Sequence, residues 1–171
     1  ITNIIVFSLI IISKFKKTFT IPHYNISKRN ATIGMIILLA IFSGLSYEDI
    51  TTKEEHMDWA NVKENLELWD LDSITNLSFE VHVRKILLIA SDEIFGNYNI
   101  IPTIASAMLL VTVYLFTNKI TNNRFAGLIS VGFLLQSNIF LSFSSIATYT
   151  VFWVLFYLIS TYTILQRNWF I

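Results

Sequence analysis

The stretch "IIPTIASAMLLVTVYLFT" at residues 100–117 contains no Asp, Glu, Lys, Arg or His. A helix needs about 20 apolar residues to cross the roughly 30 Å hydrocarbon core of a bilayer, and this stretch approaches that length. Three further stretches of the same character cover residues 31–46, 125–143 and 147–165. The sequence therefore predicts an all-α integral membrane protein with about four transmembrane helices.

The composition agrees with a chain whose surface largely faces lipid. Hydrophobic residues make up 54% of the 171 residues and charged residues only 14%, whereas soluble domains carry about 25% charge. The sequence contains no Cys, which excludes a disulfide framework, a thiolate zinc site and a cysteine nucleophile. We expect membrane lipid as a partner and no nucleic acid.

The charged residues are unevenly distributed and predict the orientation. All twelve acidic residues lie between Glu48 and Glu93, together with only four of the twelve basic residues. The other Lys and Arg residues flank alternate ends of the apolar stretches. Because Lys and Arg are retained on the cytoplasmic side of membranes, one orientation satisfies every loop and places residues 47–99 outside the cytoplasm. We expect the cell membrane, or the endoplasmic reticulum membrane if the source is eukaryotic.

The acidic loop carries two helical patterns. In residues 51–71 and 79–95, apolar residues recur at helical spacing between charged ones, which predicts two amphipathic helices on the outer membrane surface. At the other end, residues 1–30 form an apolar segment and a basic cytoplasmic linker. The apolar part, residues 1–13, is short, which leaves open a fifth span, a signal-like run or an interfacial helix. The chain begins with Ile, and we expect it to be part of a longer protein.

Acidic pairs are the main candidates for chemistry. Glu48 and Asp49 directly follow the first apolar stretch, which holds them close to the membrane surface. Asp70 and Asp72 form a D-x-D pair whose oxygens suit a hard divalent cation, Mg²⁺ or Mn²⁺. Such pairs are common by chance in an acidic loop. For acidic loops in general, a solvated helical surface without catalytic function is the simpler interpretation. The apolar stretches lack ionisable residues, which argues against a proton or ion pathway and ranks a transporter last.

Two short motifs carry a family resemblance. Phe95-Gly96 ends the second amphipathic pattern, and "RFAGL" at residues 124–128 opens the third apolar stretch after a basic turn. With the order of elements, these motifs make residues 31–171 similar to the N-terminal part of GT-C fold glycosyltransferases. These are lipid-carrier-dependent enzymes such as protein mannosyltransferases and aminoarabinose transferases.

The resemblance implies transfer of a sugar from a polyprenyl-phosphate carrier to an acceptor outside the cytoplasm. In the family, an acidic residue just after the first span acts as catalytic base or helps to bind a metal, and Asp49 occupies that place with Glu48 beside it. It often opens the second loop helix with His-Pro-Pro; His82 fits the first position, and Arg84 replaces a proline.

The family pattern is incomplete at the outer connection between the third and fourth stretches. Many members have an Arg and an acidic residue there, whereas this chain has Ser145 and Thr150. A tyrosine subgroup exists, to which Tyr149 is similar. The resemblance thus implies His82, Arg84 and Tyr149 as substrate-binding candidates. The alternative hypothesis is a non-catalytic accessory subunit that packs with other subunits of a larger membrane complex.

Overall fold

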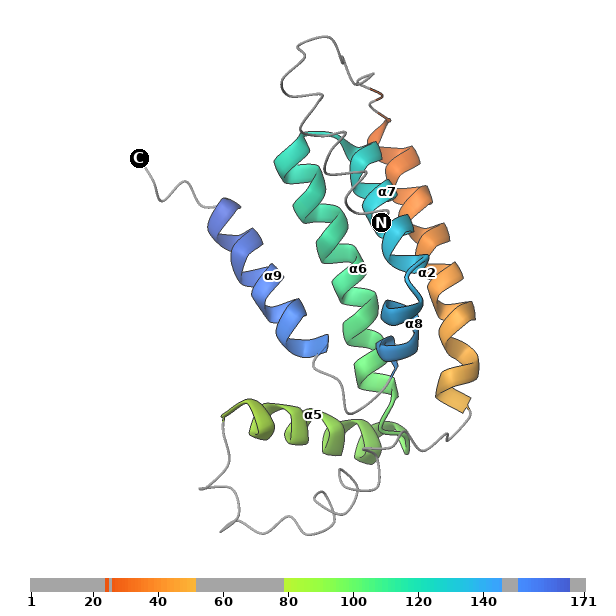
Figure 1. The fold of residues 1–171 in the computed structure, drawn as a ribbon, viewed down its shortest axis with the longest axis vertical. Coiled ribbons are helices and arrows are strands. Elements are labelled where there is room, and N and C mark those ends of the chain that lie inside the picture. Colours follow the sequence, from red (N-terminus) through yellow and green to blue (C-terminus); the bar gives the residue numbers. More distant parts are fainter. Residues whose placement is uncertain (1–23, 25, 52–78, 146–150, 167–171) are drawn as a thin grey trace, which may run out of the picture.

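The computed structural model describes residues 24, 26–51, 79–145 and 151–166. All regular elements over these residues are α-helices (Figure 1), which agrees with the expected all-helical class. The helices are α2 (Lys28–Thr51), α5 (Phe79–Phe95), α6 (Ile100–Thr121), α7 (Arg124–Leu135), α8 (Asn138–Ser144) and α9 (Val151–Gln166). The apolar segment 1–13 lies outside the described residues, as does the helix expected at residues 51–71, apart from Thr51.

The membrane prediction is supported in part. Lys28–Tyr47 within α2 and the whole of α6 are long and apolar enough to cross a membrane. A third span results if α7 and α8, which follow one another with a bend of 75°, count as one segment. Helix α9 is apolar but has only 16 residues. The described helices are therefore compatible with membrane association through two or three spans, against the four expected.

The ends of the helices have local causes. Helices α2 and α6 continue beyond the apolar stretches at residues 31–46 and 100–117, because backbone hydrogen bonding does not stop where hydropathy falls. Helix α5 has the expected bounds and ends at Gly96, which adopts a φ of +66° that favours glycine. Helix α6 ends at Asn122, which has a left-handed φ of 50°, and the Asn123 side chain then accepts hydrogen bonds from the first amides of α7.

The third apolar stretch differs from the single straight helix expected at residues 125–143. Helix α7 ends at Leu135, and the Gln136 amide still donates to the carbonyl of Gly132, at 3.1 Å. The Ser137 hydroxyl then accepts a hydrogen bond from the Phe140 amide, at 3.3 Å, and so caps α8. The polar triplet at residues 136–138 thus stops one helix and starts another, which accounts for the bend.

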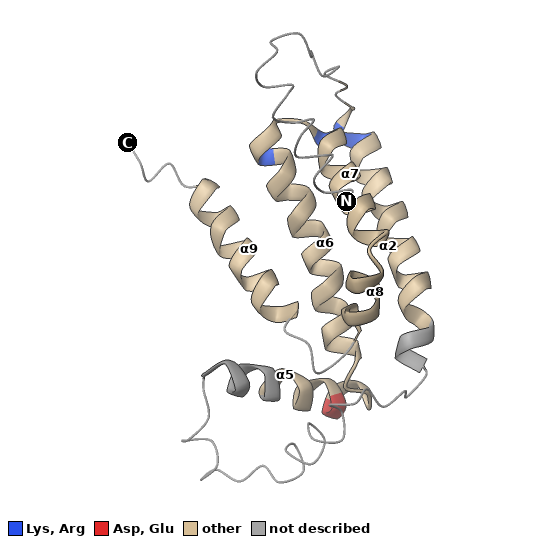
Figure 2. Cartoon of the chain, in the orientation of Figure 1, with Lys and Arg blue, Asp and Glu red and all other residues tan. Residues whose placement is uncertain are grey.

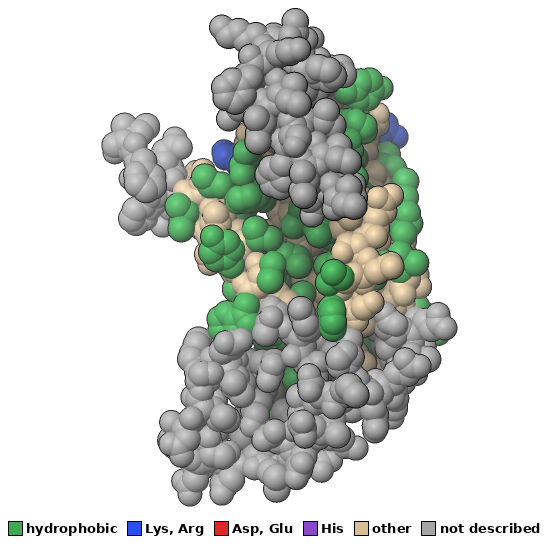
Figure 3. Space-filling model, in the orientation of Figure 1, with side chains coloured by type: hydrophobic (Ala, Val, Ile, Leu, Met, Phe, Trp, Pro, Cys, Tyr) green, Lys and Arg blue, Asp and Glu red, His purple; other side chains and the backbone are tan. Residues whose placement is uncertain are grey.

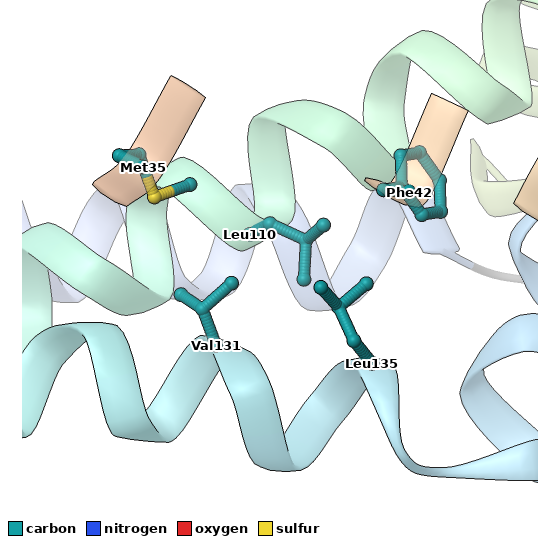
Figure 4. Close-up of a cluster of buried hydrophobic side chains, with 5 residues drawn as sticks. All are labelled: Met35, Phe42, Leu110, Val131 and Leu135. Carbon is teal, nitrogen blue, oxygen red and sulfur yellow. The ribbon is translucent and has the colours of Figure 1, made fainter. Parts of the chain in front are cut away.

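Two apolar clusters hold the bundle together, and α6 contributes to both. In the first, Leu110 of α6 packs between α2 and α7 (Figure 4). Its buried members are Met35, Phe42, Leu110, Val131 and Leu135. In the second, α6 packs against α9; its buried members are Ala105, Leu109, Val151, Phe152 and Leu155. Helix α6 is therefore the central helix, and α5 lies across one end of the bundle (Figure 1).

Charged side chains gather at opposite ends of the bundle. Lys28 and Arg29 begin α2, Lys119 lies in the last turn of α6, and Arg124 begins α7. Figure 2 shows the described basic residues at one end and the described acidic residues near the C-terminal end of α5 at the other. Between the ends, hydrophobic side chains cover much of the described surface (Figure 3). This arrangement is the one expected from alternating basic ends of membrane helices.

Candidate functional site

The structure distributes the sequence candidates over two described helices. Glu48 and Asp49 belong to the C-terminal end of α2, and His82 and Arg84 belong to the N-terminal half of α5. The other three candidates fall outside the described residues; they are Asp70, Asp72 and Tyr149.

The described candidates lie at one end of the bundle. In Figure 1, the C-terminal end of α2, the whole of α5, the start of α6 and the end of α8 all lie at the end opposite the basic residues. The chain leaves α8 after Ser144 and returns in α9 at Val151 at this same end. Helix α8 therefore ends, and α9 begins, at the end of the bundle that carries Asp49.

A buried serine fixes the corner between α5 and α6. Ser91 is 0% exposed, and its hydroxyl donates to the Asn97 carbonyl at 2.7 Å. The same oxygen accepts from the Ile101 amide in the first turn of α6, at 3.0 Å. Helix N-termini leave such amides without intrahelical partners, so Ser91 satisfies one of them and joins the two helices. Together with Leu88, which is also fully buried, this contact sets the direction of α5 and so the position of its candidates.

A second buried serine fixes the end of α8. The Ser106 hydroxyl of α6 donates to the carbonyl of Ser144 at 2.6 Å, and both residues are buried. The last carbonyls of a helix lack intrahelical donors, and Ser106 supplies one from the neighbouring helix. This hydrogen bond fixes the C-terminal end of α8 against α6.

A third serine at this end has no partner. Ser46 of α2 is 1% exposed, and its hydroxyl is the one fully buried side-chain oxygen or nitrogen of the described residues without a hydrogen bond. It precedes Asp49 by three residues, so it lies within one helical turn of the main catalytic candidate. Leaving a hydroxyl buried and unpaired costs about 1–3 kcal/mol. A buried unpaired group of this kind has one of three explanations: local strain, a catalytic role, or a bound water or ion.

None of these three serines was predicted from the sequence. Ser46 and Ser106 lie within apolar stretches, and Ser91 lies in the amphipathic pattern at residues 79–95. The available signal was the position of Ser46, which ends the apolar stretch at residues 31–46 just before Glu48.

No group of three or more metal-ligating side chains occurs in the part of the chain that the structure describes. The divalent cation expected at Asp70 and Asp72 stays a prediction, because both residues lie outside that part. No protein-family model, no curated protein and no solved structure matches the chain. The resemblance to glycosyltransferases therefore stays a prediction from the order of elements and from the sequence motifs at residues 95–96 and 124–128.

Proposed function

We propose that the chain is the N-terminal membrane portion of a GT-C type glycosyltransferase. It would transfer a sugar from a polyprenyl-phosphate carrier to an acceptor outside the cytoplasm. In this proposal α2, α6, the bent pair α7–α8, and α9 with the residues before it provide four spans. The basic end faces the cytoplasm, and the end with α5 faces outward.

One observation supports the proposal most directly. Two regions that the family uses, the residues after the first span and the second loop helix, are far apart in sequence but lie at one end of the bundle (Figure 1). The basic residues lie at the other end (Figure 2), as the topology of an outward-facing site requires.

The proposed reaction assigns distinct roles to the candidates. The Asp49 carboxylate accepts the proton of the acceptor hydroxyl, and the acceptor oxygen forms a bond to the anomeric carbon of the sugar. The bond from that carbon to the phosphate oxygen breaks, and the polyprenyl phosphate leaves with the bonding electrons. Glu48 assists Asp49, while Arg84 pairs with the phosphate and His82 and Tyr149 bind the sugar or its carrier. If Asp70 and Asp72 hold Mg²⁺ or Mn²⁺, the ion supplies further neutralisation of the phosphate.

The test measures release of polyprenyl phosphate from a panel of polyprenyl-phosphate sugars in vesicles that contain the full natural protein. Asp49→Asn is expected to abolish release, because an amide cannot accept the proton. Lys119→Gln, at the opposite end of the bundle, is the matched control and is expected to leave release unchanged. Full activity of Asp49→Asn refutes the catalytic assignment. An inactive natural protein that co-purifies with a second membrane protein would favour the accessory-subunit alternative.

A further inference from the structure

The basic end of the bundle brings together the starts of two helices. Lys28 and Arg29 begin α2 and Arg124 begins α7, and Figure 2 shows the basic residues at this one end. The Arg124 guanidinium donates from Nη1 to the carbonyl of Ile26, just before α2, at 3.2 Å. Arg124 is half-buried, whereas Lys28 and Arg29 are exposed. The guanidinium is therefore held in place at the corner between the two helix starts.

The Arg124 guanidinium keeps most of its hydrogen-bonding capacity. A guanidinium carries five N–H donors in a planar fork whose geometry matches the oxygens of a phosphate group. The bond to Ile26 uses one donor, and among the described residues Arg124 has no other partner. In the same set, the charged groups of Lys28 and Arg29 form neither an ion pair nor a hydrogen bond. Three cationic groups thus share this corner with donors that no described residue uses.

The chain does not compensate this positive charge locally. Residues 1–47 and 94–171 contain eight Lys and Arg residues and no Asp or Glu. The acidic ends of α2 and α5 lie at the opposite end of the bundle (Figure 1). Acidic side chains are favoured in the first turn of a helix, where the helix dipole is positive, yet neither α2 nor α7 has one there. The complementary partner of this corner is therefore an anion from outside the chain.

The surface next to these cations is apolar. At the basic end, the exposed rings of Tyr24 and Phe125 meet edge to face, with 5.5 Å between their centroids. Ile33 on α2 and Ile129 on α7 are also exposed. Each follows the first basic residue of its helix by five positions, which places it about 7.5 Å further along the helix axis. In the membrane orientation proposed above, on which this inference rests, Tyr24 lies at the interface and the two Ile side chains face lipid.

A partner for this corner must carry its negative charge directly beside an apolar part. A phospholipid of net negative charge has this construction, because its phosphate is joined through glycerol to two acyl chains. A nucleic acid or an acidic peptide would meet the cations but would leave the exposed aromatic and Ile side chains uncovered. In the proposed orientation the basic end faces the cytoplasm, and the cytoplasmic leaflet is the one that carries anionic lipids.

We propose that the corner between the starts of α2 and α7 binds an anionic phospholipid of the cytoplasmic leaflet. The Arg124 guanidinium binds the headgroup phosphate, Lys28 and Arg29 attract its net negative charge, and the acyl chains lie along the exposed apolar side chains of the two helices. Loss of Arg124 is expected to lower the preference for anionic over zwitterionic lipid about fivefold, the ratio expected for one basic residue at an anionic membrane surface. This site depends on the membrane orientation and not on the sugar transfer.

The experiment uses the absence of Cys from the sequence. Ile37→Cys places a single thiol on the exposed surface of α2, one turn beyond Ile33, and a fluorophore attached there is quenched by brominated acyl chains that touch it. Leu45→Cys, exposed two turns further toward the other end of α2, is the matched control. Each labelled full chain is reconstituted in phosphatidylcholine vesicles that contain a small fraction of brominated phosphatidylglycerol or of brominated phosphatidylcholine.

The expected result is stronger quenching by the anionic lipid than by the zwitterionic one at Ile37→Cys, and equal quenching by the two lipids at Leu45→Cys. Adding Arg124→Gln is expected to lower the anionic preference about fivefold. Lys119→Gln removes a charge at the same end, from the last turn of α6, and is expected to leave most of the preference. Equal quenching by the two lipids at Ile37→Cys, or an equal loss of preference in the Arg124 and Lys119 variants, overturns the proposal. Loss of the preference on addition of inorganic phosphate also overturns it, because the site would then take a soluble anion.

Two further measurements separate the ways in which the test can fail. Because Arg124 also binds the Ile26 carbonyl, the stability of Arg124→Gln is checked by unfolding in SDS. The double variant Lys28→Gln/Arg29→Gln removes exposed side chains without hydrogen bonds among the described residues, and an unchanged preference in it contradicts the proposal. Quenching by neither lipid at Ile37→Cys would overturn the membrane topology together with the lipid site, whereas equal quenching by both overturns only the lipid site.

Discussion

Close packing of α7 on α6 at Gly127 yields the sharpest stability prediction. A Cβ atom added at Gly127 would lie 2.9 Å from the backbone oxygen of Tyr114 and 2.8 Å from its Cδ2 atom. The backbone oxygen belongs to the central helix and cannot move aside as a flexible side chain would. Gly127→Ala therefore requires α7 to shift away from α6, and the first apolar cluster, which joins these helices, must loosen.

The magnitude follows from two opposing effects. Overpacking of a tight contact costs about 1–3 kcal/mol, while replacing Gly by Ala within a helix gains up to about 1 kcal/mol. We expect a net loss of about 1–2 kcal/mol in the free energy of unfolding for Gly127→Ala. Gly132→Ala on the same helix is the matched control, since a Cβ atom there meets nothing within 4 Å. It is expected to be neutral or slightly stabilising.

The assay is unfolding of the purified chain by SDS in mixed micelles, followed by tryptophan fluorescence. The two variants are compared with the unmodified chain at the same protein concentration. A Gly127→Ala variant as stable as the unmodified chain would refute the packing argument. An equal loss in Gly132→Ala would show that the effect comes from helix α7 itself and not from its contact with Tyr114.

Two further predictions concern buried serines and have opposite signs. Ser106→Ala removes the donor to the Ser144 carbonyl and is expected to destabilise the chain by about 1–2 kcal/mol in the same SDS titration. The control Thr112→Val removes only a hydrogen bond within α6, from the Thr112 hydroxyl to the Met108 carbonyl. An equally large loss of stability in this control would count against the interhelical hydrogen bond. Ser46→Ala removes an unpaired buried hydroxyl and is expected to leave the free energy of unfolding unchanged or to raise it by up to about 1 kcal/mol. A decrease of more than about 1 kcal/mol would mean that the hydroxyl has a partner in the folded chain.

The sequence predicted a helix accurately where the ends of the apolar or amphipathic pattern are also the ends of the helix. Helix α5 begins and ends as expected, because its charged and apolar residues alternate at helical spacing and Gly96 terminates it. Helices α2 and α6 were placed correctly but extend beyond their apolar stretches, since hydropathy reports solvent preference and not hydrogen bonding.

The bend between α7 and α8 was not predicted. Averaged over residues 125–143, the stretch is apolar enough for one continuous span, and that average conceals the local effect of Gln136, Ser137 and Asn138. Ser137 is a good N-cap, so its hydroxyl competes with continuation of the helix. A residue-by-residue search for capping side chains within apolar stretches would have found this break.

For the candidate site, the sequence indicated which residues to consider and on which side of a membrane they belong. It did not indicate what positions them. Ser91 and Ser106 act through hydrogen bonds to residues 6–38 positions away, and such partners appear only when the helices are packed. The roles of Asp49, His82, Arg84 and the other candidates stay predictions.

The most direct test of the membrane topology is the accessibility of single thiols at the two ends of the bundle. Glu93→Cys at the end of α5 and Lys119→Cys at the end of α6 both replace exposed residues in a chain without natural Cys. A membrane-impermeant maleimide is expected to label Glu93→Cys in intact cells, and to label Lys119→Cys only after the membrane is permeabilised. Labelling of Lys119→Cys in intact cells, or protection of Glu93→Cys, would contradict the proposed orientation and with it the outward-facing site.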